Sequence, residues 1–304
     1  MPRVGEIPGF VGRTLEDFVE HECPTRAAAL AFYTFFSLPA LLLVLLTMLG
    51  LLADPQEVQR QLTVQLGQVV GPAGAEQVVD IIHYLTAEET RPAGVTILGL
   101  LALLFGATAA FAALQGALNH IWSVAPDPQR GTLRNFLAKR LFSFGIILVV
   151  GFLLLVSLLL STALVAMGER VAAMLPGWTA PLLWLVNTGF SLALIAALFG
   201  AMFKVIPDVE VAWRDVWAGA LFTAGLFVLG KEAIGLYLGS KDVGDAYGAA
   251  GSLAMLLLWV YYTSMTVLLG AEITRAWEVR YGAGVRPSRG AVEVVEEKRT
   301  VRGG

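Results

Sequence analysis

Residues 98–113 read LGLLALLFGATAAFAA, a run without a charged side chain. Residues 146–160, IILVVGFLLLVSLLL, have the same character. A core helix of a soluble protein would carry a polar stripe toward water, and these two runs carry almost none. They therefore predict helices that are surrounded by lipid or by other protein on every side.

Six long apolar stretches follow one another along the chain. They lie at about residues 28–52, 95–118, 142–167, 181–203, 217–238 and 252–271. Each has ~20 residues or more, enough at ~1.5 Å per residue to cross a hydrocarbon core ~30 Å thick. Charged residues make up only 15% of the 304 residues, against ~25% in an average soluble domain. The sequence predicts an all-α integral membrane protein with six transmembrane helices.

The basic residues indicate which ends of these helices face the cytoplasm. Of the 21 Lys and Arg residues, 16 lie in the N-terminal segment, in the second and fourth connections and in the tail. The other three connections hold only Arg60, Arg91, Arg170 and Lys241. Because cytoplasmic loops carry the excess of Lys and Arg, both termini are expected in the cytoplasm. An even number of spans agrees with this orientation.

The chain is expected to divide into three parts. Residues 1–26 form a cytoplasmic segment in which Leu15, Phe18 and Val19 predict a short amphipathic helix on the inner membrane surface. Residues 27–281 form the transmembrane domain. Residues 282–304 alternate Gly, Pro, Arg and Glu and predict a disordered cytoplasmic tail. The long outer connection, residues 53–94, predicts a helical hairpin broken at Gly71 and Pro72, which either packs on the bundle or covers its mouth.

Polar residues inside the spans are the candidates for a functional site. In the second span, Gln115 and Asn119 share a stripe beside a face of small residues. Amides in lipid need partners, so both should face protein or water, either as hydrogen bonds between helices or as the lining of a cavity. In the first span, Tyr33 and Ser37 share a face. Tyr261 lies near the middle of the sixth span, where interfacial anchoring does not explain it.

We treat Tyr33, Ser37, Gln115, Asn119 and Tyr261 as the predicted lining of one cavity. Pro39 follows Ser37 and removes a backbone hydrogen bond, so the first helix is expected to kink there. The kink serves either packing alone or the opening of space beside Ser37.

Four charged residues lie within the spans or at their edges, namely Lys204, Lys231, Glu232 and Glu272. Lys231 and Glu232 fall inside the fifth span, where Lys231 either extends to the membrane surface or contacts a substrate. Glu272 lies near the inner end of the sixth span, and we expect it to pair with a basic residue of that layer, such as Lys204 or Arg214.

The sequence lacks the patterns of known catalytic sites. The three His residues stand apart from any Cys or carboxylate at metal-ligand spacing, and no phosphate-binding Gly-rich loop or Ser-His-Asp motif occurs. We therefore expect no cofactor, no metal, no nucleic acid and no enzyme activity. The single cysteine, Cys23, excludes an intrachain disulfide.

Several short strings in the same order resemble the BrkB/YihY family of bacterial inner-membrane proteins. They are AAALAFY at 27–33, SLP at 37–39, ALNHIW at 117–122, Ile206-Pro207, Trp213-Arg214-Asp215 with Gly219, Tyr247-Gly248 with Gly251, and Trp259 followed by Gly270-Ala271-Glu272. The resemblance covers about residues 15–280 and implies six spans with cytoplasmic termini. Members were once labelled ribonuclease BN and others are linked to envelope integrity, but the metal-binding clusters of a metallonuclease are missing here.

Two functions remain open at this point. The first is a transporter or permease of an amphiphile or lipid, which the polar groups in the spans favour. The second is an envelope protein that does not transport and instead holds partners or organises lipid, with its polar groups joining helices. A membrane-embedded hydrolase has no positive support. Membrane lipids are the expected partners, and an oligomer would be compatible with the small-residue face of the second span.

Overall fold

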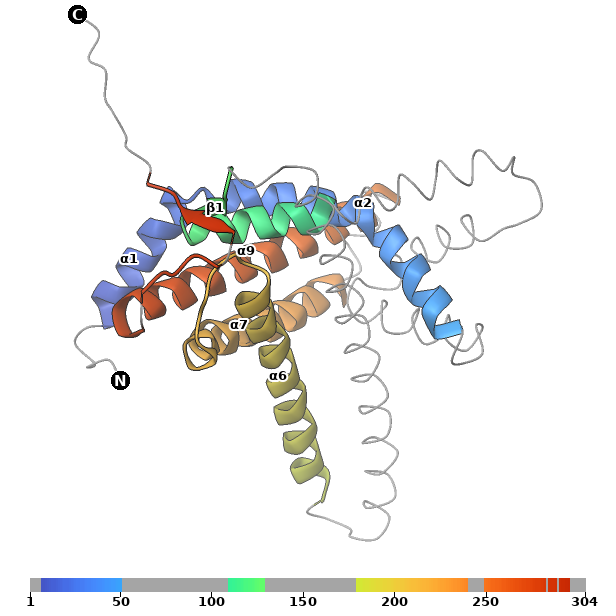
Figure 1. Ribbon diagram of the computed structural model, residues 1–304. Coiled ribbons are helices and arrows are strands. Elements are labelled where there is room, and N and C mark those ends of the chain that lie inside the picture. The colour runs from blue at the N-terminus through green and yellow to red at the C-terminus, as the bar shows by residue number, and fades with distance from the viewer. Residues whose placement is uncertain are drawn as a thin grey trace, which may run out of the picture.

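The computed structural model describes residues 7–50, 109–128, 179–239, 249–282, 284–288 and 290–295, and most of them are helical (Figure 1). A further helix covers residues 109–121. The other elements are α1 (Ile7–Glu20), α2 (Cys23–Gly50), β1 (Val124–Pro126), α6 (Thr179–Val205), α7 (Trp213–Gly239), α9 (Ala249–Tyr281) and β2 (Ala291–Glu293).

Four of the predicted spans coincide with helices of the structure. They are the first, fourth, fifth and sixth, which correspond to α2, α6, α7 and α9. The helix over residues 109–121 covers the end of the second span. The third span and the hairpin predicted at residues 53–94 lie outside the described residues.

The mainly helical class is therefore confirmed, and six spans remain a prediction. Within the described parts of the chain, only Leu256–Tyr281 in α9 is clearly long and apolar enough to cross a membrane. Leu192–Val205 in α6 forms a shorter apolar helix.

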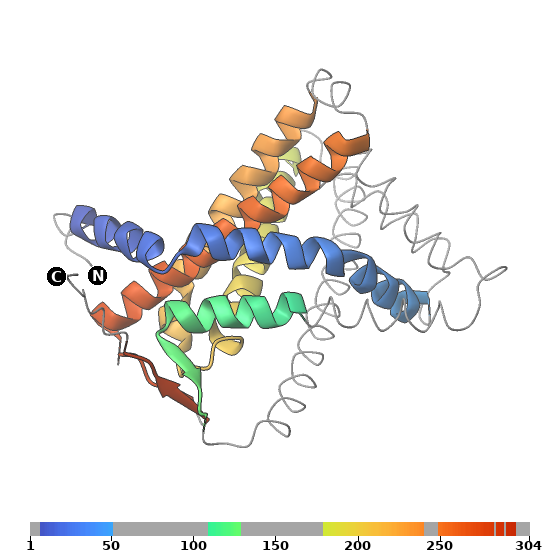
Figure 2. The same cartoon turned by 90° about the horizontal axis from the view of Figure 1, so that it is seen from above.

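The tightest helix packing joins α7 to α9, which run side by side in Figure 2. Each helix contributes a glycine followed four residues later by a threonine. A Cβ atom on Gly219 would overlap Thr274 Oγ1 and the backbone oxygen of Gly270. A Cβ atom on Gly270 would overlap Thr223 Oγ1. The two backbones can approach this closely only because both positions are glycine, as is common between membrane helices.

The threonines at this crossing satisfy their own hydroxyls. Thr223 Oγ1 donates to the Gly219 oxygen and Thr274 Oγ1 donates to the Gly270 oxygen, each over 2.8 Å. No hydroxyl at the crossing therefore needs a partner on the opposite helix.

Aromatic side chains continue the packing from α6 through α7 to α9. Phe199 contacts Phe227, Phe227 contacts Trp259, and Trp259 stacks on Tyr262, with ring centroids 5.4–6.0 Å apart. Tyr262 lies against Gly230 and donates its hydroxyl to the Leu226 oxygen over 2.7 Å. The aromatic residues in the middle of α9 thus face protein, which explains their position away from a membrane surface.

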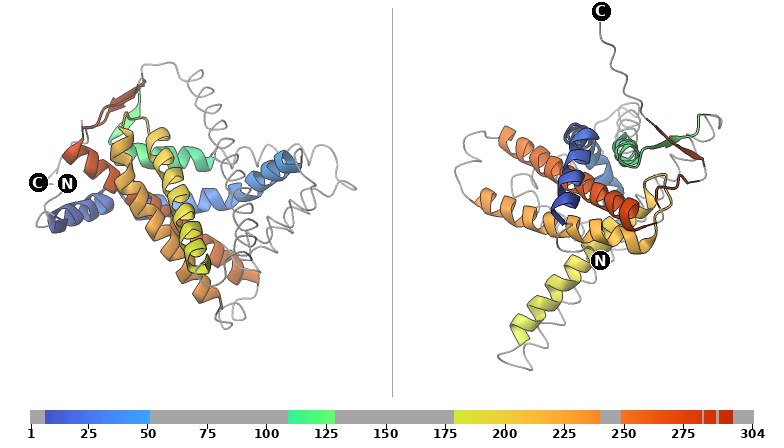
Figure 3. Two further views of the ribbon diagram at one scale, coloured as in Figure 1. Left: turned by 90° about the horizontal axis from the view of Figure 1, so that it is seen from below. Right: turned by 90° about the vertical axis from the view of Figure 1, so that its left-hand side faces the viewer.

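Helix α1 packs on the C-terminal end of α9 and leads directly into α2 (Figure 3). Glu22, between the two helices, adopts a φ of 53°, a left-handed conformation that ends α1 before α2 begins. Thr14 and Phe18 are buried, whereas Val11, Leu15 and Val19 are exposed. This exposed apolar stripe is consistent with the predicted amphipathic helix, and its place on a membrane surface remains a prediction.

The prediction of a disordered tail is wrong for the described residues after Gly282. Strand β2 pairs antiparallel with β1, with Ala125 opposite Val292. Residues 284–288 pair with the connection between α6 and α7: Glu210 N donates to the Arg286 oxygen and Ser288 N donates to the Asp208 oxygen. Partners far away in the sequence supply these backbone hydrogen bonds, so the composition of the tail could not indicate them.

Helix α2 changes direction along its length in both Figure 1 and Figure 2. Pro39 lies within this helix, and a proline inside a helix is a usual cause of a bend. A kink at Pro39 itself remains a prediction.

Candidate functional site

A pocket of about 270 Å³ lies between α2, the helix over residues 109–121, α6 and α9. Most of its wall is apolar, and four hydroxyl-bearing side chains interrupt that wall. They are Thr34 and Ser37 from α2 and Thr263 and Ser264 from α9. The apolar residues are Leu30, Ala110, Phe111, Leu114, Met202, Val260 and Val267. We refer to this space as the hydroxyl-lined pocket.

The hydroxyls of this pocket differ in how they are satisfied. Ser37 Oγ donates to the Thr34 oxygen over 3.0 Å, within its own helix. Thr263 Oγ1 is buried and makes no hydrogen bond to any residue that the structure describes. A buried hydroxyl without a partner costs free energy, so Thr263 is the group in this wall that would gain most from a polar ligand atom.

Of the five residues predicted to line one cavity, one lies in the hydroxyl-lined pocket, and a cavity shared by all five stays a prediction. Ser37 lines the hydroxyl-lined pocket, and the other four are not among the described residues of its wall. Tyr33 is 41% exposed. Tyr261 is partly buried against the main hydrophobic core.

Gln115 and Asn119 instead hold the connection that follows α6. Gln115 Nε2 donates to the Ile206 oxygen over 3.2 Å and approaches Asp208 Oδ1 at 3.4 Å. Asn119 Nδ2 donates to Asp208 Oδ2 over 2.8 Å, and Asn119 Oδ1 accepts from the Asp208 backbone N–H over 2.8 Å. The sequence indicated that both amides need partners but gave no sign that Asp208, 89 residues away from Asn119, is one.

The charged residues at the inner layer pair differently from the prediction. Lys204 donates to the Val211 oxygen, and Arg214 pairs with Asp215 over 3.2 Å. The expected pairing of Glu272 with Lys204 or Arg214 is therefore wrong. Lys231 and Glu232 lie in α7, and their side chains are outside the described set.

Glu272 pairs with His21, which precedes α2. His21 Nδ1 and Glu272 Oε1 are 2.6 Å apart, and the Glu272 side chain is only 1% exposed. Cys23 Sγ donates to the same oxygen over 3.6 Å. The His120 ring meets the His21 ring edge-on, with centroids 5.6 Å apart. These side chains form a buried polar cluster where α2, α9 and the helix over residues 109–121 meet.

Cys23 and Glu272 influence each other within this cluster. Burial raises the pKa of the Cys23 thiol well above its ordinary value of 9.0, and the nearby Glu272 carboxylate raises that pKa further. The thiol is therefore protonated at neutral pH and can act as a hydrogen-bond donor. Glu272 Oε2 is buried and has no hydrogen-bond partner in the described part of the chain.

The residue types of this cluster, His, Cys and Glu, are ones that can bind a metal ion. Across the described ranges of the chain, no group of three or more His, Cys, Asp or Glu side chains is placed to hold a metal ion. The arrangement supports hydrogen bonding between helices, and the hydroxyl-lined pocket is the better candidate for a ligand.

Comparison with known proteins gives a consistent family assignment. The family model described as "Virulence factor BrkB" matches residues 14–293. A UPF0761 membrane protein of Nitrosospira multiformis is 27% identical over 275 residues, which cover 89% of this chain and 62% of the relative. One of Pseudomonas paraeruginosa is 28% identical over 270 residues, which cover 86% of this chain and 62% of the relative. One of Delftia acidovorans is 31% identical over 196 residues, or 64% and 44% of the two chains.

The chain thus spans less than two thirds of the length of these curated relatives. No solved structure matches it. The matched relatives are named as membrane proteins and not as enzymes. Because the family model covers most of the sequence, this chain belongs to the BrkB family of membrane proteins.

Proposed function

We propose that this protein is a permease for an amphiphile, such as a lipid. The observation that carries the proposal is the hydroxyl-lined pocket, in which the Thr263 hydroxyl is buried without a hydrogen-bond partner among the described residues. An apolar wall with a few fixed polar groups is the usual form of a small-molecule site. The apolar residues would contact the hydrocarbon part of the ligand, and Thr263 and Ser264 would bind its polar part.

The proposed setting is the bacterial inner membrane, with six spans, an outer hairpin at residues 53–94 and both termini in the cytoplasm. Contacts among the connections support this orientation. The N-terminal segment packs on the end of α9, β1 pairs with the tail, and the tail pairs with the connection between α6 and α7. The described parts of the N-terminal segment, the second and fourth connections and the tail therefore meet at one end of the bundle. They are the same segments that carry the excess of basic residues, so one charged face is a consistent interpretation.

The proposal includes no enzyme activity, no cofactor and no nucleic-acid partner. Membrane lipids are the proposed partners, through which the protein would contribute to envelope integrity. An oligomer is compatible with the proposal but is not required, because the hydroxyl-lined pocket is built from helices of one chain.

The permease proposal can be tested with the full chain in vesicles of phosphatidylcholine. The probe is phosphatidylglycerol with a fluorescent label, whose movement between leaflets is followed by quenching from outside. Thr263→Val removes the unpaired hydroxyl at nearly constant volume. We expect it to slow the movement of the probe while leaving the protein as stable as wild type, or more stable, because no hydrogen bond to a described residue is lost.

Thr223→Val is the matched control, because Thr223 is a buried threonine of α7 outside the pocket. It should change stability without a specific loss of lipid movement. If wild-type protein moves the probe no faster than empty vesicles, or if both variants move it as fast as wild type, the permease proposal is wrong.

The polar contacts around Asp208 and Glu272 favour the alternative, a protein that organises lipid or partners without transport. In this alternative, Gln115, Asn119 and His21 serve only to join helices and connections. The wild-type protein would then bind lipid in the vesicle assay without moving it, which separates the two functions.

A further inference from the structure

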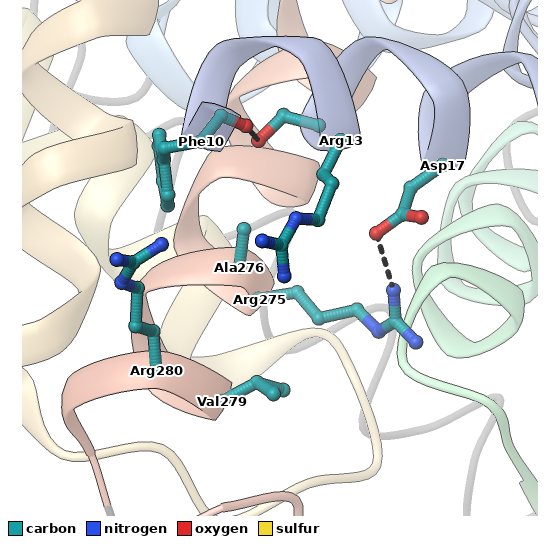
Figure 4. A pocket seen from close by; sticks show the side chains of 8 residues that line it. Phe10, Arg13, Asp17, Arg275, Ala276, Val279 and Arg280 are labelled. Carbon is teal, nitrogen blue, oxygen red and sulfur yellow. Dashed lines mark hydrogen bonds and ion pairs between the residues drawn. The ribbon is translucent and has the colours of Figure 1, made fainter. Parts of the chain in front are cut away.

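A second pocket, of about 410 Å³, lies between α1 and the C-terminal end of α9 (Figure 4). Its wall is formed by Phe10, Arg13, Thr14 and Asp17 from α1 and by Arg275, Ala276, Val279 and Arg280 from α9. We refer to it as the arginine pocket. It shares no lining residue with the hydroxyl-lined pocket.

The arginine pocket has a strong excess of positive charge. Three of its eight lining residues are arginines, and Asp17 is the single carboxylate among them. Asp17 Oδ2 pairs with Arg275 Nη1 over 3.3 Å, and the dashed line in Figure 4 marks this contact. Arg13 comes from the opposite helix, so both walls of the pocket carry guanidinium groups.

Two of these arginines, Arg13 and Arg275, keep N–H donors that no described residue satisfies. No hydrogen bond or ion pair joins Arg13 to another described residue. Arg275 Nε is buried and also lacks a hydrogen-bond partner in the described part of the chain. A buried donor without a partner is rare in folded proteins, and a bound ion is one physical cause of such a donor.

We propose that the arginine pocket binds a phosphate group. Guanidinium groups offer several N–H donors in a planar fork that matches phosphate oxygens, and a phosphate would offset the excess positive charge of the lining residues. In this arrangement Asp17 orients Arg275, while Arg13 and Arg280 approach the anion from the two helices. The inference is independent of transport, because the site lies outside the hydroxyl-lined pocket.

Two sources of phosphate fit this chemistry. Arg275 lies four residues beyond the predicted end of the sixth span, or ~6 Å along the helix, which is the depth of lipid headgroups. An anionic phospholipid could therefore present its phosphate while Phe10 and Val279 contact its apolar part. Free phosphate or a soluble phosphate ester could reach the same arginines from the water phase.

The test compares the full wild-type chain with Arg13→Gln, Arg280→Gln and the double variant. All are placed in phosphatidylcholine nanodiscs with or without phosphatidylglycerol, and lipid retained by the protein is measured by native mass spectrometry. In parallel, inorganic phosphate is titrated against the protein in pure phosphatidylcholine, with thermal stability as the readout. Arg286→Gln is the matched control, because Arg286 is exposed and lies outside the arginine pocket.

We expect each arginine removed to weaken binding of the anion by about fivefold, the effect of one basic charge at an anionic membrane surface. Arg286→Gln should have a smaller effect. If the arginine variants lose bound phosphatidylglycerol selectively, the site is supported and its ligand is a lipid. If they lose the stabilisation by inorganic phosphate, the site is supported and its ligand is a free phosphate.

The proposal is overturned if neither anion binds wild type more tightly than it binds the double variant. It is also overturned if Arg286→Gln weakens binding as much as Arg13→Gln or Arg280→Gln does. Equal melting temperatures of all variants in pure phosphatidylcholine are the check that each variant is folded. Because Arg13 and Arg280 are exposed, we expect that check to be met.

Discussion

Asn119 and Asp208 form a two-point hydrogen-bonded pair between the helix over residues 109–121 and the connection that follows α6. The Asn119 amide nitrogen donates to the Asp208 carboxylate, and the Asn119 amide oxygen accepts from the Asp208 backbone, both over 2.8 Å. One side chain thus fixes both the backbone and the carboxylate of its partner. The backbone oxygen of the same Asp208 accepts from Ser288 N in the tail, so three distant segments depend on this position.

Asn119→Ala should lower the free energy of unfolding by about 2–4 kcal/mol, because two hydrogen bonds are lost and one of them involves a charged group. Asn119→Asp should lower the free energy of unfolding still more near neutral pH. It keeps the acceptor for the backbone N–H but places a second carboxylate against that of Asp208. Unfolding in mixed detergent micelles measures both. Gln115→Leu is the comparison, with an expected loss of about 0.6–2 kcal/mol. If Asn119→Ala were as stable as wild type, the pair of Asn119 and Asp208 would contribute nothing to the free energy of unfolding.

Gly219→Ala should destabilise the contact between α7 and α9. A methyl group there would overlap both Thr274 and the Gly270 backbone, and backbone atoms cannot move aside as a flexible side chain can. We expect a loss of about 1–3 kcal/mol or more, the range for overpacking.

Gly225→Ala, in the same helix, is the matched control. An added Cβ atom at Gly225 meets nothing within 4 Å among the described residues, and alanine favours a helix over glycine by up to about 1 kcal/mol. The control should therefore unfold at the same temperature as wild type or higher. Equal behaviour of the two variants would contradict the close crossing of α7 and α9.

The sequence predicts the described helices of this protein well, but it predicts poorly which residues contact one another between them. Apolar length and the loss of a polar stripe are local properties, so the first, fourth, fifth and sixth predicted spans coincide with α2, α6, α7 and α9, although α9 extends ten residues beyond the predicted end at residue 271. The pairing of Glu272 with His21 joins residues 251 positions apart. Several basic residues were predicted to lie at the same depth in the membrane as Glu272, and depth alone could not identify its partner.

The candidate site shows the same limit. Periodicity places Ser37 and Gln115 on faces of their own helices, but it does not fix how those helices rotate against one another. Thr263 was missed because a threonine beside Tyr262 and Ser264 carries no distinguishing pattern. Only the packing of α2 against α9 reveals that its hydroxyl is buried without a described partner.

Stability should fall at alkaline pH because of Cys23. The folded state keeps the thiol protonated, since burial raises its pKa, whereas the unfolded chain ionises near the ordinary value of 9.0. Above that pH the unfolded state therefore binds fewer protons than the folded state, and stability decreases by up to about 1.4 kcal/mol per pH unit. Below that pH the contribution is constant.

Cys23→Ala isolates this effect, because Cys23 is the one cysteine of the sequence. The melting temperatures of wild type and Cys23→Ala should keep a constant difference up to about pH 8, and wild type should lose stability relative to the variant toward about pH 10. Parallel curves over the whole range would show that the thiol ionises equally in both states.

The orientation of the chain can be tested with single cysteines at Gln129 and Gln68, in the Cys23→Ala background. The charge distribution predicts that Gln129 is cytoplasmic and that Gln68 lies outside. On intact cells, a maleimide that does not cross membranes should label Gln68→Cys only, and Gln129→Cys should react after the cells are opened. Labelling of Gln129→Cys from outside, with Gln68→Cys protected, would reverse the orientation.

The His21–Glu272 pair should contribute strongly to stability, because the carboxylate is almost completely buried. His21→Ala leaves that buried carboxylate with only the weaker Cys23 thiol contact to a described residue. We expect a loss of about 3–5 kcal/mol, the cost of removing one partner of a buried pair. Glu272→Gln has the same shape without the charge and should cost less.

A double-mutant cycle separates the pair from the effects of each residue. If the two side chains stabilise each other, His21→Ala combined with Glu272→Gln should cost less than the sum of the single changes, because no buried charge is then left behind. Asp17→Asn combined with Glu272→Gln is the control, since the Asp17 carboxylate pairs with Arg275, and the backbone hydrogen bond from His21 N to the Asp17 oxygen is kept. Its effects should add. Additive losses in the first cycle would show that the 2.6 Å contact carries no coupling energy.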